Sequence, residues 1–596
     1  MSNKVIVFGV DGLMMPLIKK FAAEGALPHI SKMLAQGAAA ELLPFISAWG
    51  DVNWVAFLSG QSPGTSWSGQ GIPADGERTD NLLARLAKNG QRAALVHFPE
   101  SIASPAPHFT YSPYWGHVEP CPYAFAAPAI FTTRYEERTQ SRAAPDQTLG
   151  WPPASPLAYH DKGLWQPLEQ QAERWRLALA STHGEGVTLW LESGGETPLI
   201  RYGDTLTPAP VGEWSGWIAL GPAAGNAQIR FWTARYSPQE NDVEIVQSQA
   251  ILPARVASDT RLSHELTERF GPFISQWAVK ASPNEPWLRS TLQDAERQSL
   301  WLAESALYLT HREGFALWAV VHHLIDESHH LCLGQYDPRS PFYNLQQAPR
   351  YEAVMRECYQ ILDRTLGKIM DEMDDDCTLL LASDHGAVPN EYLCDVNRYL
   401  AKQGLVALND RDEVDIGRSL VYLKDERGGL EIFVNLRGRE PGGIVPPQDY
   451  EAVREAVLQA LGNWAIQHNG FPRKAVAWAL RKEDAASVGY WGDSAGDLLF
   501  TYSTGFVWGT SRGGEDICPV TAPGANHGPQ KPTAETDHSS NYGVILAYGA
   551  GIQKGYYRDR QQRGPHRMVD PAATIAHLLG IEHGSLDGNV MYDFLA

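Results

Sequence analysis

The sequence lacks the features that mark membrane, disulfide-rich and repeat proteins. No run of roughly 18 or more apolar residues occurs along its 596 residues, so we expect no membrane-spanning helix. The first residues, MSNKVIVFGVDGL, enter a strand pattern directly and do not resemble a secretory signal. Its six cysteines form no CxxC pair, and we expect reduced thiols in the core. Without repeats or low-complexity tracts either, the chain is predicted to be a soluble, cytoplasmic globular protein.

Positive charge is also scarce. The chain has 49 Lys and Arg against 69 Asp and Glu, a net charge of -20. The electrostatic field of so negative a protein repels nucleic acid and anionic membranes, so we expect neither as a partner. A small anionic substrate would need a local source of positive charge, and bound metal is the obvious one. The oligomeric state is open, with a homodimer among the options.

Strands and helices alternate along much of the chain. Short apolar runs at 4–10, 91–98, 315–323 and 377–386 have the pattern of buried parallel strands. The segment from Tyr351 to Met373 has the periodicity of an amphipathic helix. This alternation predicts an α/β sandwich with a mainly parallel central sheet flanked by helices. In such a sheet, ligands bind beyond the carboxyl ends of the strands.

Two regions depart from this alternation. From about residue 111 proline, glycine and tryptophan rise, and stretches such as VTLWLESG and AQIRFWTARYS have the pattern of antiparallel strands. We therefore predict a β-rich insertion at 111–299, with the catalytic core formed by 1–110 and 300–596. A second irregular region at 413–526 is predicted to form another cap.

Carboxylates and imidazoles stand close to apolar strands in four stretches, VFGVDG, HHLIDESHH, LLASDHG and TDHSSNYGVILAYG. The candidates are Asp11, Asp326, His330, Asp384, His385 and His538. Each alone also fits an ordinary role, because Asp often caps a helix and an interior His is usually hydrogen-bonded. Together, their mixture of oxygen and nitrogen donors suits zinc or manganese. Asp326 and His330, four residues apart, share one face if that segment is helical.

Taken as a set, these motifs resemble the alkaline phosphatase superfamily, in particular its type I phosphodiesterase and nucleotide pyrophosphatase branch. The resemblance is carried by KVIVFGVDG, LPHISKMLAQGA, SGQSPGTSW, DESHH, SDHG, DHSSNYGVILAYGAGI and VDPAATIAHLLGI. It implies an alkaline phosphatase-like sandwich and two divalent metal ions, most readily Zn²⁺ with Mn²⁺ as the alternative. Two such ions can clamp the attacking and leaving oxygens of a displacement at phosphorus.

The resemblance also implies the ligands of each ion. Asp326, His330 and His538 would hold one, and Asp11, Asp384 and His385 the other. His527, in GANHGP, is an alternative to His538. We prefer His538 because the strand VILAYG follows it at the spacing that this family uses.

One position breaks the family pattern. Family members carry a Thr or Ser nucleophile ten residues before the glycine of a TG or SG turn, and counting back from Gly60 reaches Gly50. Asp51 could complete the second site while a metal-activated water attacks, or it could simply cap the following helix. Ser47 could supply the hydroxyl if three residues are looped out. Alternatively, Gly50 leaves space for a nucleophile that a second substrate brings.

Asn53 matches a position where relatives place an Asn that donates to a phosphoryl oxygen, although it could also be an ordinary buried turn residue. We therefore expect Asp51 and Asn53 to take part in catalysis, with Asn53 also binding substrate. The predicted function is two-metal hydrolysis of phosphate esters or phosphodiesters. The alternatives are a metal-dependent transferase or lyase of a biosynthetic pathway and an inactive, ligand-binding homologue.

Overall fold

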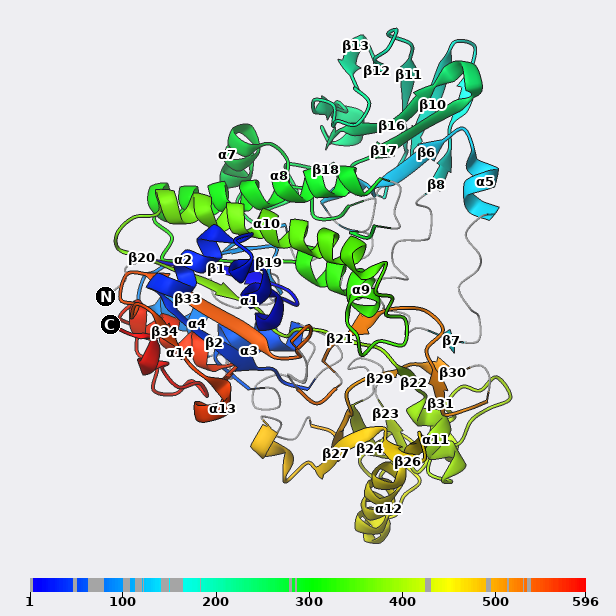
Figure 1. The fold of residues 1–596 in the computed structure, drawn as a ribbon, viewed down its shortest axis with the longest axis vertical. Helices are drawn as coiled ribbons and strands as arrows, with labels where there is room; N and C mark the ends of the chain where they lie inside the picture. The colour runs from blue at the N-terminus through cyan, green and yellow to red at the C-terminus, as the bar shows by residue number, and fades with distance from the viewer. Residues whose placement is uncertain are drawn as a thin grey trace.

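A nine-stranded sheet forms the centre of the molecule (Figure 1). The computed structural model describes residues 4–46, 51–62, 80–99, 108–112, 121, 123–140, 149–150, 165–182, 184–277, 281–283, 287–423, 430–488, 495–511, 514–528, 530–532 and 537–596. The strands lie in the order β34-β2-β33-β20-β1-β19-β3-β4, and β35 also pairs with β2. Their bounds are β1 Lys4–Val10, β2 Ala38–Leu43, β3 Ala93–Val96, β4 Phe109–Tyr111, β19 Leu317–His322, β20 Cys377–Ala382, β33 Gly543–Gly549, β34 Tyr556–Tyr557 and β35 His566–Arg567.

The middle of this sheet is parallel. β1 pairs in parallel with both β19 and β20, in a register that sets Gly9 beside Val321 and Ala382. β19 continues in parallel to β3, and β3 to β4, whereas β33 runs antiparallel to β20 and β2. The carboxyl ends of β1, β19 and β20 therefore meet at one edge of the sheet.

Both faces of the sheet are buried, as the strand sequences predict. Alternate residues of β1 enter different clusters, Val5 and Val7 one and Ile6 and Phe8 the other. The first cluster includes α3 Asp51–Ser59, α4 Leu82–Lys88 and α14 Asp570–Leu578. The second includes α1 Met15–Ala23, α2 Pro28–Gln36, α8 Leu288–Leu307, α9 Leu324–Tyr336 and α10 Ala348–Glu372. The predicted α/β sandwich with a mainly parallel sheet is confirmed.

Strands between residues 124 and 251 form three further sheets away from the central one (Figure 1). The largest contains β9 Glu169–Gln171, β10 Arg174–Leu179, β11 Val187–Glu192, β12 Leu199–Tyr202 and β13 Thr205–Pro208. The other two contain β5 Ala124–Ala126, β6 Ala129–Thr132, β8 Trp165–Pro167, β14 Ile218–Ala219, β15 Gln228–Ile229, β16 Phe231–Ser237, β17 Asp242–Gln247 and β18 Ala250–Ile251. The inward residues of these sheets share one apolar core.

This β-rich region is fixed to α8. The indole N–H of Trp214 donates to the Ser290 carbonyl at 3.1 Å, and that of Trp232 donates to Gln293 Oε1 at 3.2 Å. Arg230 and Asp294 form a buried ion pair. After β18, α7 Thr260–Phe270 and α8 pack in the cluster that covers the central sheet. The predicted boundaries of the insertion at 111–299 and of the core stay a prediction.

A further lobe lies at the opposite end of the molecule (Figure 1). Its sheet has the order β23-β24-β28-β27 and lies beside α12 Tyr450–Asn463 and the hairpin β25–β26. The strand bounds are β23 Val421–Leu423, β24 Glu431–Val434, β25 Ala465–His468, β26 Phe471–Lys474, β27 Val476–Arg481 and β28 Leu498–Tyr502. The predicted cap at 413–526 likewise stays a prediction. Within the part of the chain that the structure describes, no helix is long and apolar enough to cross a membrane.

Gly9, one residue before the end of β1, is predicted to tolerate no side chain. An alanine Cβ there would lie 2.4 Å from the backbone oxygen of Val320 and 2.8 Å from the buried Trp54 ring. Because neither neighbour can move away within the packed core, we expect Gly9→Ala to lower the free energy of unfolding by about 1–3 kcal/mol. Thermal unfolding measures this as a lowered midpoint.

Gly462 provides the matched control, since it lies on α12, faces solvent and has open space around its Cβ position. Gly462→Ala is expected to stabilise by about 0.5–1 kcal/mol. Equal midpoints for the two variants would show that the close contact across β1 and β19 is absent.

Candidate metal centre

Acidic and histidine side chains gather at the edge where the parallel strands end. Asp11 directly follows β1, and Asp384 and His385 follow β20 by one residue. Asp326 lies in the first turn of α9, the helix that begins beyond β19, and His330 follows one turn later. The segments are far apart in sequence, but the parallel register of β1, β19 and β20 brings them together.

One group consists of two carboxylates around a single imidazole. His385 Nε2 lies 2.9 Å from Asp384 Oδ2 and 3.2 Å from Asp11 Oδ1. All three residues are almost fully buried, and their ligand atoms lie within 4.8 Å of one another. Two carboxylates and an imidazole at this separation can hold a divalent cation.

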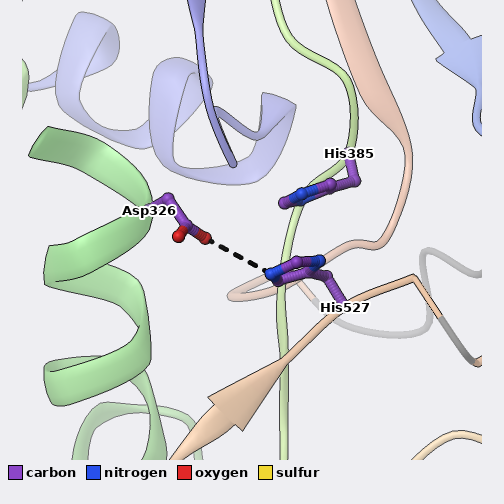
Figure 2. Close-up of side chains that lie close together, drawn as sticks. All are labelled: Asp326, His385 and His527. Carbon is purple, nitrogen blue, oxygen red and sulfur yellow. Dashed lines mark ion pairs between the residues drawn. The ribbon is translucent and has the colours of Figure 1, made fainter. Parts of the chain in front are cut away.

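A second group forms around Asp326. His330 Nε2 lies 3.2 Å from Asp326 Oδ2, and His527 Nε2 lies 3.7 Å from Asp326 Oδ1. Figure 2 shows Asp326 facing His527, with the His385 ring stacked on His527. The centroids of the stacked rings are 3.6 Å apart, with 10° between the ring planes. Asp326, His385 and His527 also qualify as a group that could hold a cation.

The turn after β1 allows these groups to lie side by side. Gly12 has φ of 71°, in the left-handed region, and a Cβ on it would lie 3.0 Å from Asp326 Cα. A glycine therefore satisfies both the turn conformation and the close approach of α9. Its N–H donates to Asp384 Oδ1 at 3.3 Å, which helps to orient that carboxylate.

Backbone carbonyls bind one ring nitrogen of His330 and of His385, which leaves the other nitrogen of each ring able to bind a metal ion. His330 Nδ1 donates to the Ala525 carbonyl at 2.7 Å, and His385 Nδ1 donates to the Gly386 carbonyl at 2.8 Å. Because a carbonyl can only accept, Nδ1 carries a proton in each ring, so Nε2 is the nitrogen that could bind a cation. Among the described residues of the centre, five buried atoms make no hydrogen bond by geometry, although some lie within ion-pair distance of one another: Asp326 Oδ1, His330 Nε2, Asp384 Oδ2, His385 Nε2 and His527 Nδ1.

The side chains of the centre also shift one another's pKa values. Burial opposes protonation of His330 and His385, but Asp326 raises the pKa of His330, and Asp384 together with Asp11 raises that of His385. Burial, together with the charge of Asp11, raises the pKa of Asp384 to about 7. Burial opposes ionisation of Asp326 as well, but the neighbouring His330 imidazole holds the pKa of that carboxyl below its usual range. Burial lowers the pKa of His527, so its ring is neutral and able to coordinate. The donor set therefore fits the metal ions that the sequence analysis predicts.

His538, preferred as a ligand from the sequence, belongs to neither group. Its half-buried ring lies 5.4 Å from that of Tyr336, centroid to centroid. His527 lies beside Asp326 and His385, and the assignment of His538 as a ligand stays a prediction. His527 directly follows β32 Ala525–Asn526, which pairs with β21 Val388–Pro389 shortly after His385. A two-residue strand pair of this kind leaves no recognisable pattern in the sequence.

The predicted catalytic positions are only partly described. Ser47 and Gly50 lie outside the described residues; α3 begins at Asp51, whose side chain is likewise outside them. Asn53 is fully buried, and its Oδ1 accepts the Phe45 N–H at 2.7 Å. Asn53 Nδ2 has no partner among the described residues and remains available as a donor.

Two other histidines lie around the centre. His329, next to His330 in sequence, packs against Tyr359, with Nε2 3.3 Å from its hydroxyl. His323 approaches from the opposite side, with Nε2 3.5 Å from Asp11 Oδ2. Neither His329 nor His323 belongs to a group that could hold a metal ion among the described residues.

Comparison with known proteins assigns the family. The sequence profile of type I phosphodiesterase / nucleotide pyrophosphatase matches residues 190–537, more than half of the chain. The chain belongs to this family. Members of the type I phosphodiesterase family are phosphoester hydrolases, and the alkaline phosphatase superfamily that contains them is metal-dependent. No curated protein matches the sequence significantly.

Several solved structures resemble the whole chain. Murine ectonucleotide pyrophosphatase / phosphodiesterase 5 has 11% identity and a TM-score of 0.44, with 100% of both chains covered. The wild-type alkaline phosphatase PafA has 12% identity and a TM-score of 0.46, covering 100% of this chain and 99% of its own. Phosphonoacetate hydrolase from Sinorhizobium meliloti, in complex with phosphonoformate, has 11% identity and a TM-score of 0.44, with 97% of this chain and 96% of its own covered.

Removal and return of zinc should show whether His527 or His538 binds the metal. At zinc concentrations about 100 times the dissociation constant, binding to the folded chain alone adds about 2.7 kcal/mol of stability. We expect zinc to raise the midpoint of thermal unfolding of chelator-treated protein. His527→Ala should lose most of this shift, because it removes a ligand, whereas His538→Ala should keep it. The opposite result for the two variants would assign the site to His538.

Proposed function

We propose that the protein is a two-metal-dependent hydrolase of phosphate esters or phosphodiesters. The proposal is carried by the buried carboxylates and imidazoles that converge at the end of the parallel strands, where their inner atoms contact mainly one another. Leaving a buried polar atom without a partner costs about 1–3 kcal/mol, and more if the group is charged. A cluster of such atoms with both nitrogen and oxygen donors is best explained by cations that bind them.

In the proposed centre, Asp326, His330 and His527 hold one cation, and Asp11, Asp384 and His385 hold the other. Zn²⁺ suits these borderline and hard ligands, and Mn²⁺ is the alternative. Two bound cations would polarise a phosphoryl oxygen and lower the pKa of an attacking water. They would also supply the positive charge that a small anionic substrate needs in a chain whose net charge is -20.

Gly50 distinguishes this chain within its family. The position where relatives carry Thr or Ser has no side chain here, so no hydroxyl at that position can attack phosphorus. We therefore propose a single displacement by water. Asp51, at the beginning of α3, is proposed to add a carboxylate to the second cation site.

Asn53 is proposed to bind the phosphoryl group. Its Oδ1 is fixed by the Phe45 N–H, which also fixes the plane of the amide. The remaining Nδ2 donor is buried and lacks a partner, so it can stabilise negative charge that develops on a phosphoryl oxygen. This donor adds no charge and needs no reorganisation during the reaction.

The hydrolysis of bis-p-nitrophenyl phosphate tests these roles. We expect the zinc-loaded protein to release p-nitrophenolate, and Asp384→Ala to abolish turnover because it removes a ligand. Asn53→Ala should lower kcat by about 10²–10³ while zinc stoichiometry is unchanged, as for loss of one oxyanion donor. Ser47→Ala serves as the matched control and should leave the rate unchanged, since the proposed nucleophile is water.

The stereochemical course separates water from a protein nucleophile. A single displacement inverts the configuration at phosphorus, whereas two displacements through a covalent intermediate retain it. With a chiral phosphorothioate diester in ¹⁸O-labelled water, we expect inversion. Retention, or loss of turnover in Ser47→Ala, would contradict direct attack by water. Full zinc loading without turnover of any phosphate ester would favour a transferase or lyase.

A further inference from the structure

His323 lies beside the proposed metal centre but, among the described residues, belongs to neither group of ligands. It directly follows β19 and is the N-cap residue of α9, so it stands at the same strand ends as Asp11. The main chain fixes the two positions relative to each other, because the Asp11 N–H donates to the His322 carbonyl at 2.9 Å and extends the pairing of β1 with β19. The first turn of α9 also holds His323, whose carbonyl accepts the Glu327 N–H at 3.0 Å.

The side chain of His323 contacts Asp11 and does not cap the helix. An N-cap side chain commonly accepts a backbone N–H of the first helical turn, but His323 makes no such bond within the described part of the chain. Its Nε2 lies 3.5 Å from Asp11 Oδ2, and the two side chains are only 15% and 6% exposed. A carboxylate oxygen can only accept, so the contact is favourable when Nε2 carries a proton, as it does in one neutral tautomer of the ring.

The two oxygens of Asp11 face different partners. Oδ1 lies 3.2 Å from His385 Nε2, inside the group that could hold a cation, whereas Oδ2 lies 3.5 Å from His323 Nε2. Asp384 is arranged in the same way, with Oδ2 2.9 Å from His385 Nε2 and Oδ1 accepting the Gly12 N–H at 3.3 Å. Each carboxylate thus places one oxygen next to the imidazole and the other next to a group that can donate.

The outer partner of Asp11 differs in kind from those of the other two ligands. Backbone groups orient Asp384 and His385, through the Gly12 N–H and the Gly386 carbonyl. The partner of Asp11 is a side chain, which a substitution can remove without changing the ligand itself. The orientation of Asp11 is therefore open to a direct test.

The ring of His323 packs against that of His97, which is rigidly held. The ring centroids are 5.8 Å apart, with 76° between the ring planes. His97 is buried and has a φ of 48°, in the left-handed region. Its N–H donates to the Tyr111 carbonyl at 2.8 Å, and its Nδ1 donates to the Ser112 carbonyl at 3.2 Å. A fixed neighbour of this kind limits the orientations that the His323 ring can adopt.

We propose that His323 is a positioning residue: it donates from Nε2 to Asp11 Oδ2 and so holds Oδ1 toward the cation of Asp11, Asp384 and His385. This role rests on the two-cation centre of the proposed function. His323 orients the ligand and does not bind the cation itself. Groups that orient metal ligands in this way typically change metal affinity by a factor of about 10–100. The orientation of Asp11 gains weight here because Gly50 supplies no hydroxyl to the centre.

Zinc titration of the metal-free protein against a competing chelator tests this role. We expect the wild type to bind two zinc ions, and His323→Ala to weaken the binding of one of them by about 10–100-fold. His323→Gln should recover most of the affinity, because its amide N–H reaches the place of the ring Nε2. His323→Asn, whose amide lies one carbon closer to the backbone, should not. His264→Ala is the matched control, since it removes an exposed histidine of α7.

Anomalous diffraction at the zinc edge identifies the weakened site. In His323→Ala crystals at limiting zinc, the peak beside Asp11 should fall relative to the peak beside Asp326. The midpoint of thermal unfolding of the zinc-free variants should match that of the wild type, which separates ligand orientation from a loss of packing.

Unchanged zinc affinity in His323→Ala, or equal losses in His323→Ala and His323→Gln, would overturn the positioning role while hydrolysis stands. The expected zinc affinities without turnover of any phosphate ester would contradict the proposed function and leave the positioning role standing. A wild-type protein that binds no zinc would overturn both.

Discussion

The repulsion between buried carboxylates at the end of the parallel strands is the constraint on which the site depends. Asp11 and Asp384 both lie within 3.2 Å of one imidazole nitrogen, and Asp326 faces the same space. Three such groups cannot all ionise in a dry interior unless positive charge compensates them. Their hydrogen bonds fix the outer atoms and leave the inner ones available, which is the arrangement that metal ligands require.

The fold supplies this arrangement through the register of a few strands. β1, β19 and β20 are adjacent and parallel, so residues that follow them meet although they are hundreds of positions apart in sequence. The glycine turn after β1 then admits α9 close enough for Asp326 to join the group. α8, packed over the same sheet, also anchors the β-rich region, and its Ser299 Oγ lies 3.0 Å from His322 Nε2 at the end of β19.

Much of this organisation is readable from sequence, for identifiable reasons. Buried parallel strands leave continuous apolar runs, and the polar residues that end them are conspicuous, so Asp11, Asp384 and His385 could be chosen as candidates. His527 could not be preferred, because its position depends on the two-residue pairing of β32 with β21.

The central claim is that the clustered side chains hold two cations, and anomalous diffraction at the zinc absorption edge tests it most directly. For crystals of the zinc-loaded protein, the account predicts two peaks at ligand distances of about 2.0–2.2 Å. One should be bound by Asp326, His330 and His527, and the other by Asp11, Asp384 and His385. A cluster without anomalous peaks, or a single ion bound through His538, would contradict the account.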